Sequence, residues 1–416
     1  MKRISFSIVL SMVSLVCLAQ PKPEKFLGIA AVQQDSVYYA NQAEAWHNEI
    51  LKNPKDETAW KYYYMSKYYL TWFEEESEES INPMDVIMDE ISKNIPDTYT
   101  YYFCKYRETR RNDDNKEYAD KAISLMPAEK DFFDYDNFLF YLYFHNRMDE
   151  MRKMAKDYYN SGIYSEYILE STRNELAEME PNAIFVGKTD IDIIPKLLLI
   201  YGNNEFTDKS IIIGGDFLFD DHYLEQTFKN LGIKESFEIE VDEDFASQFE
   251  DREELDEFMA GYEYYSYDTI HFIYKFIMSH TNRPMYFSKI NINSWDPSYD
   301  YFNDEGCAFR YRSSDDALSL EDCLEKIKNN YENVDKLDFL KRHSVDERWT
   351  GCITYAMIWA RVLEMAAVKY KIDGNTTKYE ETISFIKDIN KGMGLDDSES
   401  DEQIQSTLDY INSLVE

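Results

Sequence analysis

The hydrophobic pattern changes its period in the middle of the chain, and this change constrains the fold more than any other feature. The apolar run Ala183–Gly187 is short and continuous, Ile191–Tyr201 follows with helical spacing, and Ser210–Ile213 is a second short apolar run. Short apolar runs separated by a helix are typical of parallel strands buried on both faces. The sequence therefore predicts a small parallel α/β layer within residues 181–314. Further strands are expected near 284–289 and at Cys307–Tyr311.

Helical spacing dominates on both sides of this layer. Residues 20–180 contain amphipathic segments separated by prolines, at intervals that bracket the roughly 34-residue tetratricopeptide unit. The segment Asn53–Trp60 is similar to the start of such a repeat. Residues 315–416 predict long helices joined by short polar segments, which pack as hairpins. We expect an α-rich α/β fold with a tetratricopeptide-like helical-repeat domain first, although generic paired helices are the alternative for that region.

The composition supports a folded, helix-rich and acidic protein. Its 35 Tyr, 25 Phe and 6 Trp residues can fill a large core, and only 13 Gly and 10 Pro argue against a turn-rich all-β fold. Core packing is the simplest role for the aromatic residues, with a sugar-stacking platform as the alternative. The formal net charge of −36 repels phosphate groups, so neither nucleic acid nor an anionic membrane surface is an expected partner.

The first nineteen residues predict export. Two basic residues precede the apolar run Ile4–Val16, and small residues at Cys17 and Ala19 fit a signal-peptidase site. The run is shorter than the ~20 residues of a membrane span, and the bulky Val16 disfavours lipidation of Cys17. We therefore expect a periplasmic or secreted protein that is soluble after cleavage at Ala19–Gln20. Mass spectrometry of the native protein can identify that terminus.

A second apolar segment, Ile353–Val368, is interrupted by Arg361 and Glu364 and predicts a core helix. The mature chain is therefore expected to have no transmembrane span. Four cysteines remain after cleavage, and an oxidising compartment permits disulfides between them. Buried free thiols are the alternative, and the spacing does not decide between the two. The four are Cys104, Cys307, Cys323 and Cys352.

Three acidic runs punctuate the chain: Glu74–Glu79, Glu235–Glu257 and Asp396–Glu402. Runs of like charge favour solvent contact over burial. The first and last are expected to be solvated loops. The second is expected to be a surface segment that leaves the α/β layer.

Signatures of common catalytic sites are absent from the sequence. It contains no HExxH, GxSxG, GxxxxGK[ST] or GxGxxG motif, so we name no catalytic residue, metal-ligand set or cofactor. Four polar residues follow the first two predicted strands, where open α/β sheets bind ligands. Carboxylates with an imidazole could hold a sugar or a divalent metal there. The alternative, which we favour, is that Asp221 caps its helix and His222 is exposed. The four candidates are Asp190, Asp192, Asp221 and His222.

Four segments of the α/β region resemble, in order, the soluble C-terminal part of the bacterial membrane protein O-mannosyltransferase-like family. The agreement is best in the second, through Leu218, Asp221, Tyr223 and Gln226. The first keeps a Gly and the last Asp of the family's Gly-Asp-Asn-Asp-Thr sequence. The four segments are Asn182–Pro195, Ile211–Gln226, Arg283–Phe287 and Gly306–Arg310. The resemblance implies an exported α/β domain with tetratricopeptide-like helices. It also implies that the chain is not an autonomous glycosyltransferase, because the family's multi-span region is missing here.

Two function classes follow from the sequence. The first is an exported, non-enzymatic interaction or scaffold protein of the cell envelope, whose helices present a surface to a protein partner or an envelope glycan. The second is a sugar- or metal-binding α/β domain, catalytic or not, related to envelope glycosylation. The second class needs the four candidate residues to converge on one cleft. We favour the first class because no activated nucleophile can be named.

Overall fold

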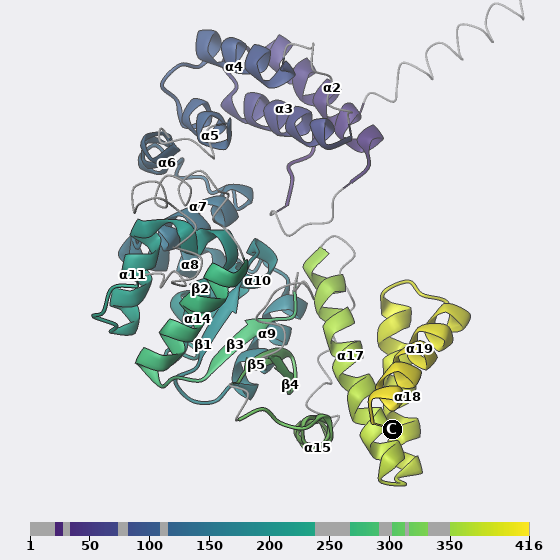
Figure 1. Cartoon of the computed structure of the whole chain (residues 1–416). Helices are drawn as coiled ribbons and strands as arrows, with labels where there is room; N and C mark the ends of the chain where they lie inside the picture. Colours follow the sequence, from purple (N-terminus) through teal and green to yellow (C-terminus); the bar gives the residue numbers. More distant parts are fainter. Residues whose placement is uncertain are drawn as a thin grey trace, which may run out of the picture. The chain divides into compact units, whose positions relative to one another are not determined.

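The computed structural model describes residues 21–27, 34–73, 82–108, 115–237, 267–290, 302–312, 316–331 and 350–415. The chain forms two compact units. The first comprises Met1–Gly28 and Gln33–Asp134, and the second comprises Ile29–Val32 and Tyr135–Glu416. Helices predominate in both, and the second unit adds a small mixed sheet, so the predicted α-rich α/β fold is confirmed (Figure 1).

The described part of the first unit consists of helices that pack in pairs. α2 packs against α3, and α5 packs against α6 (Figure 1). Asp35 and Asp56 cap the first two helices by accepting backbone N–H groups of Tyr38 (2.7 Å) and Ala59 (3.0 Å). Paired helices are therefore present, and the tetratricopeptide geometry stays a prediction. The elements are α2 (Ser36–Lys52), α3 (Glu57–Leu70), η1 (Thr71–Phe73), α4 (Pro83–Asn94), α5 (Tyr99–Glu108) and α6 (Asn115–Ser124), and α7 (Phe133–Phe144) begins at the boundary between the units.

A buried lysine holds the first unit together. The Lys61 side chain is 5% exposed, and its ammonium lies 2.6 Å from the carboxylate of Asp131 and 2.8 Å from that of Asp134. The hydroxyls of Tyr62 and Tyr99 donate to the same two carboxylates. Because each charge in this core has partners, the group serves structure.

The sheet of the second unit has five strands in the order β2-β1-β3-β5-β4. β1 pairs in parallel with both β2 and β3, which confirms the predicted strand–helix–strand arrangement. β5 is antiparallel to β3 and β4 is antiparallel to β5, so the layer is mixed, not wholly parallel. The strands are β1 (Ile184–Gly187), β2 (Ser210–Ile213), β3 (Met285–Ser288), β4 (Phe302–Asp304) and β5 (Ala308–Tyr311).

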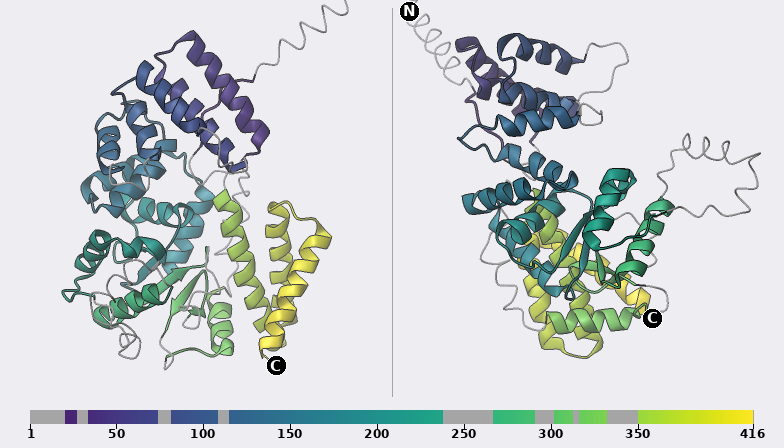
Figure 2. Two further views of the ribbon diagram at one scale, coloured as in Figure 1. Left: turned by 45° about the horizontal axis from the view of Figure 1, so that its top comes forward. Right: turned by 90° about the vertical axis from the view of Figure 1, so that its left-hand side faces the viewer.

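The parallel strands are mostly apolar because both faces are covered. Every residue of β1 and β3 is buried, and helices lie on both sides of the strands (Figure 2). Our sequence prediction did not include β4, because this three-residue strand carries polar side chains and lies at the sheet edge. The connecting elements are α10 (Asp190–Leu197), the π-turn η2 (Leu198–Gly202), η3 (Gly215–Phe219), α11 (Asp221–Leu231) and α14 (Tyr267–Thr281).

Two helices that precede the sheet belong to the second unit. α8 (Met148–Ser161) packs on η2, and α9 (Glu166–Glu178) packs on α10 and α17. At Gly202, an added Cβ would lie 2.7 Å from the backbone oxygen of Ala155, so α8 and η2 approach closely. The boundary between the compact units lies between Asp134 and Tyr135. The hydrophobic pattern of the sequence changes later, near residue 181, so α8 and α9 belong to the same unit as the sheet although their pattern resembles that of the first unit.

The C-terminal part of the unit is helical, and α17 is its centre. α15, α18 and α19 all pack against α17. The apolar spacing of Val334–Arg342 also predicts a helix, and this segment lies outside the described residues, as does most of the acidic run Glu235–Glu257. The helices are α15 (Leu320–Asn330), α17 (Thr350–Ile372), α18 (Thr376–Gly392) and α19 (Asp397–Val415).

One helix in the described part of the chain, Gly351–Ile372, is long and apolar enough to cross a membrane. Of its most apolar window, 72% is buried inside the structure. A core helix has the same length and composition, so this finding is weak support for a membrane span.

The last acidic run begins a helix, which corrects the prediction of a loop at Asp396–Glu402. The Asp396 carboxylate accepts the backbone N–H groups of Ser398 (2.8 Å) and Glu399 (2.9 Å). The Glu399 carboxylate accepts the N–H of Asp396 in return (3.0 Å). Carboxylates stabilise a helix N-terminus through this reciprocal cap and through the helix dipole, so an acidic run can begin a helix and stay solvated.

Candidate functional site

The sequence-predicted site at the strand edge contains a buried ion cluster. The Asp192 carboxylate lies 3.1 Å from the Lys196 ammonium, which lies 2.7 Å from the Glu175 carboxylate. The side chains of Lys196, Asp192 and Glu175 are 0%, 1% and 5% exposed. The ammonium also lies 3.9 Å from the centre of the Phe185 ring. We call Glu175, Asp192 and Lys196 the buried ion cluster.

Local structure explains how Asp192 comes to be buried. Asp192 and Lys196 are four residues apart on α10, so they share one face of that helix. The Asp192 carboxylate also accepts hydrogen bonds from the Ser288 side chain and the Lys188 backbone. These bonds fasten the start of α10 to the carboxyl ends of β3 and β1. Gly187 is required at that point, because an added Cβ would overlap the Asp192 carboxylate.

Burial controls the protonation of this region. Burial raises the pKa of Glu175 to about 7, although Lys196 opposes the shift. Burial also raises the pKa of Glu178, one turn further along α9, to about 8. The Glu178 carboxylate accepts the backbone N–H of Cys307 at 3.0 Å. Glu175 is buried and Glu178 is half-buried, and the two connect α9 to α10 and to the start of β5.

The other three predicted residues do not join Asp192. Asp221 and His222 are exposed on the first turn of α11, and Asp190 is half-buried at the start of α10. An enclosed carboxylate and two solvent-facing side chains cannot line one open cleft. Within the described residues, no group of three or more His, Cys, Asp or Glu side chains is placed to hold a metal ion.

The predicted capping role of Asp221 is wrong by one residue. The side chain of Asp220 accepts the backbone N–H of Tyr223 at 2.8 Å and so caps α11. Asp221 is the first helical residue, where its charge favours the positive end of the helix dipole. Gly232 ends this helix with φ of 79°, the left-handed conformation that glycine commonly adopts just after a helix.

The four cysteines are buried and free, which answers the question that the sequence left open. The thiol of Cys352 lies 3.1 Å from the Ser165 hydroxyl, and that of Cys307 lies 3.6 Å from the Tyr331 hydroxyl. Burial raises the pKa of the Cys323 thiol to about 11 and raises those of Cys104 and Cys307 as well. Thiols with raised pKa values are poor nucleophiles, so these cysteines serve packing.

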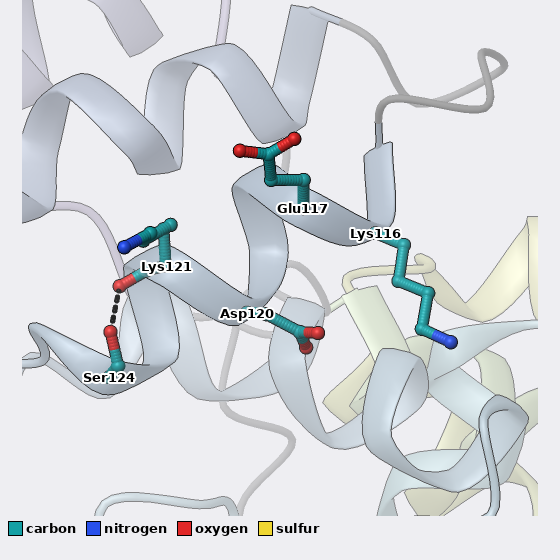
Figure 3. Close-up of a pocket in the computed structure, with 5 residues that line it drawn as sticks. All are labelled: Lys116, Glu117, Asp120, Lys121 and Ser124. Carbon is teal, nitrogen blue, oxygen red and sulfur yellow. Dashed lines mark hydrogen bonds between the residues drawn. The ribbon is translucent and has the colours of Figure 1, made fainter.

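A shallow hollow on α6 has the wrong geometry for a binding site. Its described lining residues all lie on that helix, and their charged side chains point in different directions (Figure 3). The hydroxyl of Ser124 donates to the backbone oxygen of Lys121 at 2.8 Å, so it is already engaged. Side chains that diverge from one helix cannot surround a ligand.

Exposed aromatic side chains mark a different part of the first unit. Tyr68 and Tyr69 lie on the last turn of α3, and Trp72 and Phe73 lie on η1. Trp72 makes edge contacts with Tyr69 (centroids 5.0 Å apart) and Tyr68 (5.7 Å). Tyr69 in turn stacks on Tyr39 of α2, with centroids 4.9 Å apart. We call Tyr68, Tyr69, Trp72 and Phe73 the aromatic surface.

This aromatic surface is both fixed and accessible. Trp72 is 53% exposed and Phe73 is 46% exposed. The Arg107 guanidinium lies over the Tyr68 ring, 4.9 Å from its centre. The sequence continues with Glu74–Glu79, which contains five glutamates. Two large apolar side chains that stay exposed on a supported base are typical of an interaction surface.

Sequence reasoning missed this surface, because we assigned the aromatic residues to the core. Many of them are indeed buried, including Tyr62, Tyr64 and Phe103. The signal that could have found it is the pair Trp72–Phe73, which stands at a helix end directly before an acidic run.

Comparison with known proteins finds no match to a protein-family model, to a curated protein or to a solved structure.

Proposed function

We propose that this chain is an exported, non-enzymatic interaction protein of the cell envelope. We further propose that its aromatic surface binds a basic, amphipathic segment of a partner protein. The exposure of Trp72 and Phe73 is the observation that carries the proposal. The signal-like N-terminus supports export, as does the resemblance of the α/β region to an exported domain.

The chemistry of the partner follows from the chemistry of the surface. Two aromatic side chains favour apolar anchors, and aromatic anchors commonly dominate the free energy of binding at protein interfaces. The glutamates that follow Phe73 in the sequence and the formal net charge of −36 favour a partner that carries Lys or Arg. A segment that presents apolar residues on one side and basic residues on the other satisfies both conditions.

The strand edge gives no comparable support for an enzyme. Asp192 is enclosed by Lys196 and the residues around it, and the candidate His222 stands exposed and apart from it. A reaction would need these groups on one substrate. The buried ion cluster is better suited to holding α9, α10 and the sheet together.

Substituting both exposed residues should abolish recognition and leave the fold intact. We expect Trp72→Ser with Phe73→Ser to weaken binding of a synthetic Lys- and Leu-rich amphipathic peptide by at least about tenfold, since buried aromatic anchors contribute ~2 kcal/mol or more. The free energy of unfolding should fall by no more than about 1–2 kcal/mol, because about half of each side chain is already exposed and the lost ring contacts are few. Calorimetric titration and urea denaturation measure the two quantities.

Val86→Ser is the matched control, because Val86 is 49% exposed on α4 and lies outside the aromatic surface. That variant should bind the peptide as the wild-type protein does. The proposal fails if the double variant keeps wild-type affinity. It also fails if a peptide with glutamates in place of the lysines binds equally well.

A further inference from the structure

A cavity of about 230 Å³ lies beside β2 in the second unit. Among the described strands β2 stands at the end of the sheet, so one of its edges has no described strand beside it. α7, α8, the connection between these two helices, η2 and α11 supply the rest of the described lining. The cavity is distinct from the buried ion cluster, because none of the cluster residues lines it.

Two tyrosines seal the open edge of β2. The Tyr143 hydroxyl donates to the backbone oxygen of Ile211. The backbone N–H of Ile213 donates to the Tyr223 hydroxyl at 2.7 Å. A docking peptide strand would need these same backbone groups. The cavity is therefore suited to a small molecule and not to an added strand.

Neutral hydrogen-bonding groups form one wall of the cavity. The Asn146 amide donates to the Gln226 side-chain oxygen at 2.9 Å and accepts from the Asn230 amide at 3.4 Å. The bond to Gln226 engages its oxygen, which leaves the two N–H groups of that amide for a ligand. Asn146 has φ of 53° at the end of α7, a left-handed conformation that Asn tolerates better than most residues. The two hydrogen bonds to Gln226 and from Asn230 hold the Asn146 amide in place.

Arg152 supplies the only charged side chain among the described residues that line the cavity. Its guanidinium lies 5.7 Å from the centre of the Tyr201 ring, which orients it. Its carboxylate neighbour Asp149 is 4.0 Å away and fully exposed, so this pair is weak. A ligand carboxylate at the mouth could make a planar, two-point contact with Arg152.

We propose that this cavity binds a small hydroxylated carboxylate no larger than one sugar ring. The carboxylate would pair with Arg152, the hydroxyls would bond to the amides of Gln226 and Asn230, and the apolar face would lie on Tyr201. Sites for drug-sized ligands span about 300–1,000 Å³, and the smaller volume here sets the size limit. This inference is independent of the aromatic surface, which lies in the first unit.

Calorimetric titration of the full chain with glucuronate and glucose tests the proposal. We expect glucuronate to bind at least about tenfold more tightly than glucose, because a hydrogen bond to a charged group contributes ~1.5–3 kcal/mol. Arg152→Gln should remove this preference for glucuronate, and Arg152→Lys should keep part of it. Gln226→Leu should lower the affinity for both glucuronate and glucose. Methyl glucuronoside represents the end of a glycan chain, and open-chain gluconate represents a free sugar acid. Binding of either compound supports the proposal and shows which source of ligand the cavity accepts.

Lys153→Gln is the matched control, because Lys153 is exposed on the next position of α8 and does not line the cavity. It should bind glucuronate as the wild-type protein does. The proposal is overturned if glucuronate, its glycoside and gluconate all fail to bind, if Arg152→Gln leaves the preference intact, or if Lys153→Gln removes it equally.

Discussion

Replacing Lys196 by Met should lower the free energy of unfolding by about 3–5 kcal/mol at pH 8, the typical cost of removing one partner from a buried ion pair. The substitution leaves Glu175 and Asp192 facing one another in the interior without their shared cation. The loss should shrink towards pH 5, because protonation then removes the uncompensated charge. Urea denaturation followed by circular dichroism at both pH values measures the difference.

Lys156→Met is the control for this experiment, since Lys156 is exposed on α8. It should change the free energy of unfolding by less than about 0.5 kcal/mol. If Lys196→Met also changes the free energy of unfolding by less than about 0.5 kcal/mol at pH 8, the buried ion cluster does not hold α9, α10 and the sheet together.

Replacing Glu178 by Gln should stabilise the protein at alkaline pH. The folded-state pKa of Glu178 is raised to about 8 from its ordinary value of 4.5. The wild-type protein therefore has the full contribution of this group below about pH 4.5, and loses it as the pH rises towards 8. Gln stays neutral and can still accept the N–H of Cys307, so the variant should gain on the order of 3–4 kcal/mol at pH 8 relative to the wild-type protein.

Near pH 4.5 the Glu178→Gln variant and the wild-type protein should have similar free energies of unfolding. A difference in side-chain packing would persist at all pH values, so agreement at low pH shows that the difference at pH 8 comes from ionisation of Glu178. Glu225→Gln, exposed on α11, is the matched control and should change little at either pH. A constant difference between Glu178→Gln and the wild-type protein across this range would contradict the buried-acid explanation.

The sequence predicts those parts of the fold whose signals are local. The apolar runs locate β1, β2 and β3, and Gly232 locates the end of α11. Pairing of the last two strands was not predictable in the same way, because β4 has only three residues and no apolar pattern. The assignment of α8 and α9 to the second unit depends on packing against η2, α10 and α17, which the sequence order does not reveal.

The candidate site illustrates the same limit. Asp192 follows a parallel strand, where ligands often bind, and its local partner Lys196 lies one turn away in the sequence. Glu175 comes from the preceding helix, and only the tertiary fold shows that it completes a buried group. Asp192 was expected at an open site and is buried, whereas Trp72 was expected in the core and is exposed. Helical spacing alone does not distinguish an exposed aromatic residue from a core one.

Photocrosslinking in the native cells tests the central claim most directly. A photoreactive benzoylphenylalanine is placed at position 72, or at position 86 as the exposed control, and the products are identified by mass spectrometry. The account predicts that position 72 crosslinks to one envelope protein through a segment rich in Lys or Arg and apolar residues, and that position 86 does not. The absence of a specific product at position 72, or the same products at both positions, would contradict the claim that the aromatic surface binds a partner.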